Sequence, residues 1–152
     1  MKARINNMMG IIDNIDKSRP FSNHQPEKGP LYFTDKSHYL YYNNLVKETE
    51  TEANDWERLT LFYLLTSIKK FREAPKKFLF FNEIRPNPQA FRELLSTEEQ
   101  ALIQLAFYLY CDKSIFKIGI LDLFNSLGEE KTIIAITAIK LRFNISYELF
   151  NK

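Results

Sequence analysis

The chain has 152 residues, 45% of them hydrophobic, and its 21 basic and 19 acidic side chains leave a net charge of +2. This length and composition suit one domain with its own core and exclude an intrinsically disordered protein. The balanced charge excludes a strong general attraction to nucleic acid or to an anionic membrane. A single cysteine, Cys111, cannot form an internal disulfide, which fits the reducing cytoplasm. We expect no secretory leader and no membrane-spanning segment, because the sequence has no apolar run of the length that either needs.

Residues 1–30 are expected to form a short helix and a proline-rich linker, ahead of a single helical domain at residues 31–152. Apolar side chains recur at helical spacing from Ile5 to Ile15, which predicts an amphipathic helix. Three prolines and a glycine in residues 18–30 exclude a regular helix there. The apolar stripe would suit the chain's own domain or a second subunit, which makes a homodimer through this helix one hypothesis.

Two helices are predicted in the first half of the domain. The first begins at Asp35, which can cap it, and ends at about Lys47. The second begins at Asn54 or Asp55 and ends near Pro75. Its middle is apolar nearly all the way round, which indicates a central buried helix.

A short apolar run at residues 77–82, KFLFFN, fits a helix or a strand equally well. No second strand is apparent near it, so we expect a short helix. A loop should follow, and then another short helix that opens at Pro88 and continues to Leu95.

The clearest helix start is the capping box formed by Ser96 and Glu99, which opens a second central apolar helix at residues 96–111. A shorter helix is expected within residues 117–127, and the last long helix within 129–143, where acids come first and cations last. The predicted fold is all-α, a single irregular bundle of about six or seven helices with two central apolar helices. β-Branched residues in the last helix would also suit a strand.

Motifs of established catalytic chemistry are absent, among them H-E-x-x-H, G-x-x-x-x-G-K, G-x-G-x-x-G, G-x-S-x-G and paired C-x-x-C. We therefore predict no catalytic residue, no cofactor and no metal ion. His38 and Tyr42 lie one helical turn apart, so the imidazole can bond to the phenol or to a backbone carbonyl. We favour a structural histidine, because partners for acid–base chemistry or zinc are missing. A small-molecule or catalytic site around these two residues is the alternative.

The densest positive stretch, here called the basic segment, contains Lys69, Lys70, Arg72, Lys76 and Lys77. With a neighbouring phenylalanine as a stacking surface, it would contact phosphate in a nucleic-acid accessory factor. The small net charge favours a solvated helix end, where cations lie at the pole that the helix dipole prefers.

A glycine between two helical patterns in residues 122–142 gives the layout of a helix-turn-helix. Ile133 and Ile136 stand in its second helix, so we expect burial there rather than DNA reading. Trp56 begins a helix and would suit either a protein contact or the core. Cys111 ends a helix, where we expect a packed and unreactive thiol.

The stretches SHYLYYNNL, DWERLTLFYLL, QLAFYLYCD, DLFNSLG and AIKLRF follow one another in this order. Their order and spacing resemble a family of small uncharacterised all-helical proteins from Gram-positive bacteria and their phages. The resemblance covers residues 31–143 and implies a small cytoplasmic helical protein with no assigned activity. The matched residues that would form a shared surface are His38, Tyr42, Arg142 and Phe143. Arg142, at a helix end, would also satisfy free carbonyls.

The leading hypothesis is a non-enzymatic helical protein that acts through protein contacts, including self-association. The first alternative is a nucleic-acid accessory factor that uses the basic segment. The second is a small-molecule or catalytic site at His38 and Tyr42.

Overall fold

The computed structural model describes residues 31–93, 95–112 and 117–145. These residues contain eight helices and one two-stranded sheet. The helices are α2 (Lys36–Glu48), α3 (Trp56–Thr66), α4 (Lys69–Glu73), α5 (Pro75–Phe78), α6 (Pro88–Glu93), α7 (Thr97–Cys111), α8 (Ile120–Asn125) and α9 (Glu129–Arg142). The chain is mostly helical, as predicted. The helix and linker expected at residues 1–30 lie outside the described residues.

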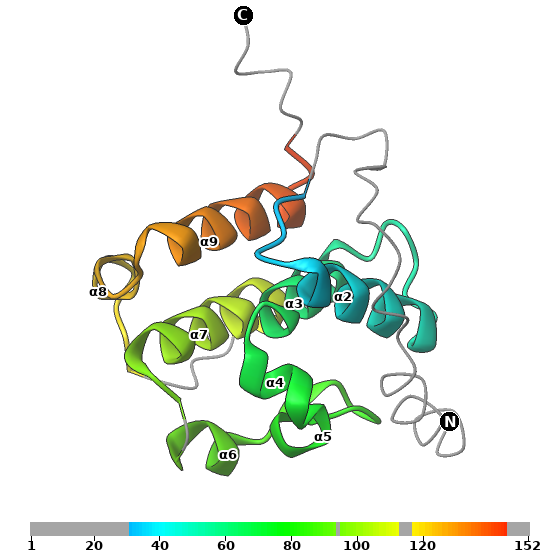
Figure 1. Ribbon diagram of the computed structural model, residues 1–152, viewed down its shortest axis with the longest axis horizontal. Helices are drawn as coiled ribbons and strands as arrows, with labels where there is room; N and C mark the ends of the chain where they lie inside the picture. The colour runs from blue at the N-terminus through cyan, green and yellow to red at the C-terminus, as the bar shows by residue number, and fades with distance from the viewer. Residues whose placement is uncertain (1–30, 94, 113–116, 146–152) are drawn as a thin grey trace, which may run out of the picture.

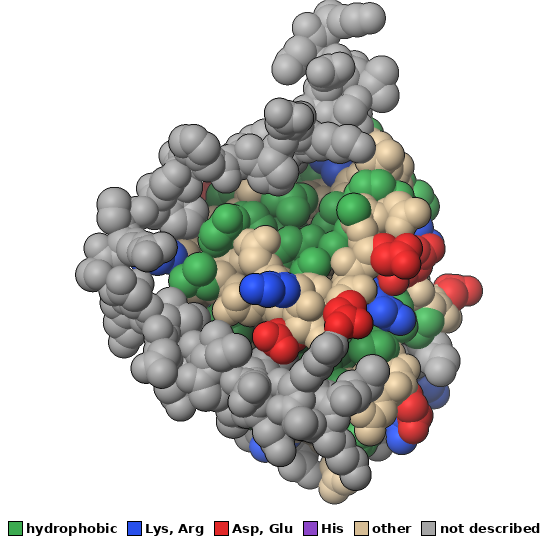
Figure 2. Space-filling model, turned by 90° about the vertical axis from the view of Figure 1, so that its right-hand side faces the viewer, with side chains coloured by type: hydrophobic (Ala, Val, Ile, Leu, Met, Phe, Trp, Pro, Cys, Tyr) green, Lys and Arg blue, Asp and Glu red, His purple; other side chains and the backbone are tan. Residues whose placement is uncertain are grey.

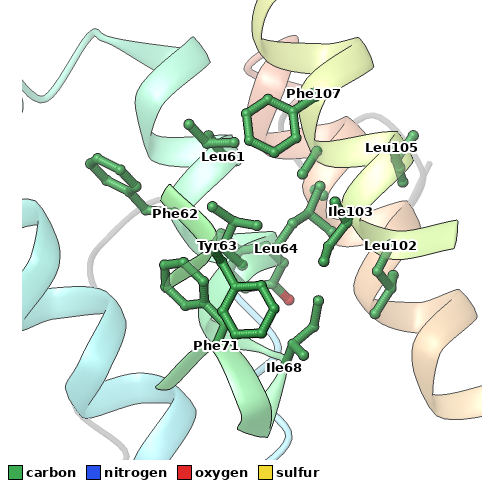
Figure 3. Close-up of a cluster of buried hydrophobic side chains, with 14 of the residues drawn as sticks. Leu61, Phe62, Tyr63, Leu64, Ile68, Phe71, Leu102, Ile103, Leu105 and Phe107 are labelled. Carbon is green, nitrogen blue, oxygen red and sulfur yellow. The ribbon is translucent and has the colours of Figure 1, made fainter. Parts of the chain in front are cut away.

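Helix α3 contacts α2, α7 and α9, and the elements from α4 to α6 lie below it in Figure 1. Every residue of α3 from Leu59 to Thr66 is buried. A helix that is covered on all sides has no solvent-facing stripe, which explains why its sequence is apolar all round. Figure 3 shows Leu61 and Leu64 of α3 opposite Phe107 and Ile103 of α7. Each such leucine stabilises the fold by about 1.5–3 kcal/mol.

Helices α7 and α9 lie one above the other and run in the same direction (Figure 1). At their N-terminal ends, Glu98 Oε1 accepts a hydrogen bond of 2.8 Å from the backbone N–H of Gly128, and Oε2 lies 3.3 Å from Lys131 Nζ. At their C-terminal ends, Arg142 Nε donates to the carbonyl of Leu109 over 2.8 Å. These contacts fix the register of two parallel helices at both ends.

The predicted helix starts are confirmed where a capping side chain lies next to the first turn. Asp35 caps α2 by accepting from the N–H of His38 over 2.7 Å, and Asp55 caps α3 by accepting from the N–H of Arg58 over 3.0 Å. Ser96 and Glu99 form both halves of the capping box of α7. Each cap satisfies N–H groups that have no partner within the helix, and is worth about 1 kcal/mol.

The single helix predicted from Asp55 to near Pro75 is wrong, because the chain bends between α3 and α4. Ile68 has an extended backbone, with φ −93° and ψ 116°. Just before the bend, the hydroxyls of Thr66 and Ser67 donate to carbonyls of the preceding turn, over 2.6 Å to Phe62 and 2.6 Å to Leu64. Such side-chain bonds compete with the helix ladder and favour its end.

The short helix predicted at residues 77–82 is also wrong in part. Helix α5 ends at Phe78, and residues Leu79–Phe80 form strand β1. It pairs antiparallel with strand β2, Arg85–Pro86, in the register Leu79 with Pro86 and Phe80 with Arg85. The partner strand lies in the stretch that we expected to be a loop, so the all-α prediction lacked this small hairpin.

Candidate functional site

His38 is enclosed in the core and has no exposed surface. Its Nε2 lies 2.9 Å from the backbone carbonyl of Tyr63, and its Nδ1 accepts from the backbone N–H of Thr34 over 3.3 Å. A ring that donates at Nε2 and accepts at Nδ1 is a neutral imidazole in one fixed tautomer. Of the two partners predicted for it, the backbone carbonyl is the one found. Both ring nitrogens are therefore occupied by the backbone.

The charge state of His38 follows from its burial. Burial lowers the pKa of the imidazole to about 4, and the nearby Arg72 charge acts in the same direction. The hydrogen bond to the Tyr63 carbonyl and the charge of Asp35 oppose this shift. An imidazole that stays neutral at pH 7 and meets no solvent has no route for exchanging a proton with a substrate.

Tyr42 lies beside His38 in an aromatic cluster that includes Phe33 and Tyr63. The Phe33 ring lies 4.8 Å from the His38 ring, edge to face, and the Tyr42 ring lies 6.0 Å from that of Tyr63. Burial raises the pKa of the Tyr42 phenol. The Tyr63 hydroxyl donates to the carbonyl of Tyr32, which ties the segment before α2 to α3. The cluster is therefore a packing unit between α2 and α3.

The basic segment does not form one positive surface. Lys70 bonds to Glu99 over 2.9 Å, and Lys69 lies 3.7 Å from Glu73. The side chain of Arg72 turns inward, with an exposed fraction of only 10%, and donates from Nη1 to the carbonyl of Thr66 over 2.6 Å. Three of the five cations are thus directed to acceptors within the protein rather than presented together to a phosphate backbone.

Arg142 connects three helices. Besides its bond to the Leu109 carbonyl in α7, its Nη2 lies 2.7 Å from Glu57 in the first turn of α3. The prediction that it satisfies a helix-end carbonyl is confirmed, and the carbonyl belongs to a neighbouring helix. Trp56, the first residue of α3, is partly buried and packs against the core. The four residues predicted to form a surface or pocket therefore pack in the core or connect helices, and they do not converge on one cavity. They are His38, Tyr42, Trp56 and Arg142.

Three residues are more exposed than the sequence predicted. Cys111 was expected to be packed, but it is exposed, with Sγ 3.5 Å from the carbonyl of Phe107. Ile133 and Ile136 were expected to be buried in α9, but they are 41% and 45% exposed. The buried residues of α9 are Ile134, Ala135, Thr137 and Ala138, which lie on the other side of the helix.

The outer side of α9 carries an apolar stripe. Phe143, which follows the helix directly, is 61% exposed. Residues 133, 136 and 143 differ by three and seven positions, which places them on one side of a helix. We call Ile133, Ile136 and Phe143 the α9 outer face. In the neighbouring helix α8, Ile120 and Leu121 are also exposed, by 57% and 77%.

A pocket of about 280 Å³ lies near the N-terminal ends of α2, α4, α7 and α9. Its lining residues run from Thr34 to Ile134 along the chain, so no local motif could have predicted it. Two members of the predicted basic segment, Lys69 and Arg72, line this pocket. Thr34 lines this pocket and its backbone N–H donates to His38, while His38 itself is not among the lining residues.

Within the described part of the chain, no group of three His, Cys, Asp or Glu side chains could hold a metal ion. None of the helices found there has the length and apolarity needed to cross a membrane.

A mostly helical chain with a buried histidine defines the class of protein only broadly. The comparison with protein families is more specific. The chain matches a family of unknown function, DUF6075, over residues 28–151, and therefore belongs to that family. This agrees with the resemblance to an uncharacterised family. No curated protein and no solved structure matches the chain.

Proposed function

We propose that this chain is a non-enzymatic, cytoplasmic helical module, an irregular bundle around α3 and α7, that works through protein contacts. The form of contact that we propose first is self-association through the α9 outer face. The observation that carries this proposal is the exposure of Ile133, Ile136 and Phe143 on one side of a helix.

The α9 outer face is unusual because the opposite side of the same helix is fully buried. Ile134 and Ala138 have no exposed surface, while Ile133 and Ile136 keep nearly half of theirs. Burying a fully exposed isoleucine is worth about 1.5–3 kcal/mol, and nearly half of each of these side chains is still exposed, so a partner that covers them gains about 1 kcal/mol for each. Exposed apolar stripes of this kind are typical of protein contact surfaces.

One face of the molecule carries a gathering of apolar side chains. Figure 2 shows hydrophobic side chains gathered in the middle of one face, with acidic and basic side chains below and beside them. An apolar centre with a charged surround is the usual composition of a protein interface. This composition supports a role in protein contacts.

The two alternative functions have less support. The basic segment is divided by internal ion pairs, which disfavours a nucleic-acid accessory factor. The enclosed and neutral His38 disfavours a catalytic site there.

The test compares the wild-type protein with Ile136→Lys by sedimentation velocity over a range of concentrations. Placing a charge in the stripe should weaken self-association at least about tenfold, because it must be desolvated when the face is covered. Ile136 is exposed, so helicity and melting temperature should hardly change.

The matched control is Phe80→Lys, which changes an apolar side chain of similar exposure, 39%, on the β1–β2 hairpin. This variant should associate as the wild type does. Equal sedimentation of all three proteins would contradict the role of the α9 outer face.

A further inference from the structure

The pocket near the N-terminal ends of α2, α4, α7 and α9 contains a guanidinium group whose hydrogen-bond donors are only partly used by the described residues. Arg72 lines it, and nine-tenths of this side chain is buried. A guanidinium has five N–H donors, and here Nη1 donates to the Thr66 carbonyl. Nη2 lies 3.6 Å from Asp35 Oδ2, which is an ion-pair distance longer than a hydrogen bond. Among the described residues, Nε has no acceptor within hydrogen-bond distance.

A charged group buried to this extent is costly when its donors are not satisfied. Arg72 lines the pocket, where a bound group can reach it. The complement of a guanidinium edge is a planar group with two oxygen acceptors, since carboxylates accept two parallel N–H bonds from arginine. The pocket therefore offers a place for an oxyanion.

The rest of the lining suggests the size and polarity of the ligand. Ile68, Leu102 and Ile134 contribute apolar side chains that are 3% exposed or less. They provide a dry surface beside the charged group. A volume of about 280 Å³ is just below the range of roughly 300–1,000 Å³ that drug-sized ligands occupy, which favours a small molecule.

The charges around the pocket limit the charge of the ligand. Three carboxylates line it, from Asp35, Glu99 and Glu130, and three cations, from Lys69, Arg72 and Lys131. Glu99 also bonds to Lys70 over 2.9 Å, outside the lining, and Lys131 pairs with Glu98 over 3.3 Å. The three carboxylates and three cations of the lining nearly cancel. A ligand with one negative charge can pair with Arg72, whereas the second negative charge of a dianion such as phosphate would be repelled by the three carboxylates.

We propose that this pocket binds a small organic monocarboxylate. Its carboxylate accepts hydrogen bonds from the free N–H groups of Arg72, and its apolar part lies against Ile68, Leu102 and Ile134. This site is independent of the α9 outer face and goes beyond a role in protein contacts.

The first experiment titrates the full chain with butyrate and follows ¹H–¹⁵N spectra, including the Arg72 Nε–H signal. The expected result is saturable shifts at Arg72, Thr34 and Ile68, with a dissociation constant of about 1–10 mM, as suits a ligand of few atoms. Butylammonium, 1-butanol and inorganic phosphate are the comparators, and each should shift these signals far less. An equal response to phosphate or to 1-butanol, or no saturable response to butyrate, would overturn the proposal.

Variants separate the role of Arg72 from a general effect of positive charge. Arg72→Gln should weaken butyrate binding at least about tenfold, because it removes the charged donors. Lys69→Gln, which removes a cation from the same lining but one that is 79% exposed, should change it less than about twofold. Equal losses in the two variants would contradict a specific site at Arg72.

Asp35→Asn gives a test that does not depend on the folding of the Arg72 variant. Asparagine can still cap α2, and the substitution removes the carboxylate that competes for Arg72. Butyrate binding should become about three- to tenfold tighter. Unchanged or weaker binding in a folded Asp35→Asn protein would count against the proposed position of the carboxylate.

Discussion

A histidine among tyrosines is a common candidate for catalysis, but the surroundings of His38 show that its role is structural. Its two ring nitrogens connect the segment before α2, through Thr34, to the main chain of α3, through Tyr63. The ring must be neutral to accept at Nδ1. The fold is therefore sensitive to the protonation of a single side chain.

This sensitivity predicts a pH dependence of the free energy of unfolding. The pKa of His38 is about 4 in the folded chain and 6.5 when unfolded, so the unfolded chain binds more protons between these values. The stabilisation is complete above pH 6.5 and is lost as the pH falls toward 4, by about 3 kcal/mol in total. Urea unfolding of the wild type and of His38→Gln at pH 7 and pH 4 measures this loss in the free energy of unfolding. Glutamine cannot be protonated, so the wild type should lose about 3 kcal/mol more than the variant, and equal losses would refute this account.

Arg142 illustrates how one side chain joins distant parts of the fold. Its bond to the Leu109 carbonyl satisfies one of the last acceptors of α7, while its pairing with Glu57 involves a carboxylate side chain that is 43% exposed. The carbonyl bond should therefore matter more than the ion pair, because exposed pairs contribute little.

We predict that Arg142→Ala lowers the free energy of unfolding by about 1–3 kcal/mol, because it leaves the Leu109 carbonyl without this donor. Glu57→Gln, the matched control, should lower it by less than about 1 kcal/mol. Chemical denaturation of both variants decides between the two contributions. A larger effect from the Glu57 variant would show that the ion pair dominates.

At the scale of elements, the helix ends that are set by neighbouring residues were predictable. Asp35, Asp55 and Ser96 each lie three residues before the N–H group that they accept from, so a cap can be recognised from a short window of sequence. The bend at Ile68 and the β1–β2 hairpin were not predictable in this way. The bend depends on hydroxyl bonds to the preceding turn, and β2 is only two residues long and contains a proline.

The end of α7 offers a prediction about helix capping. Asp112 adopts a left-handed conformation, with φ 53° and ψ 33°, directly after the helix. Its negative charge lies at the pole where the helix dipole disfavours it. Asp112→Asn removes the charge and keeps a side chain that tolerates this conformation, so it should stabilise the protein by about 0.3–1 kcal/mol.

The control is Asp112→Ala, which also removes the charge but places a β-carbon without a polar group in the left-handed region. It should be less stable than the asparagine variant by about 1 kcal/mol. Melting temperatures of the two variants test this. Equal stabilisation by alanine and asparagine would mean that the backbone conformation of residue 112 costs nothing.

At the scale of the whole molecule, the sequence indicated a mostly helical protein because α3 and α7 are long apolar segments that open with recognisable caps, and α9 begins with acids and ends with cations. It did not indicate the pocket, since Thr34, Arg72 and Ile134 are brought together only by the packing of separate helices. It also treated Arg72 as one of five surface cations, although its side chain turns inward. Periodicity alone likewise could not tell which side of α9 faces the core, because isoleucines lie on both sides.

The central claim concerns the α9 outer face, and the most direct test is the mass of the wild-type protein in solution. Light scattering behind a sizing column, at several loading concentrations, compares this mass with the 18.1 kDa of one chain. We predict a mass that rises with concentration toward twice that of one chain, and that stays near 18.1 kDa for Ile136→Lys. A wild-type mass equal to one chain at every concentration would contradict self-association through this face.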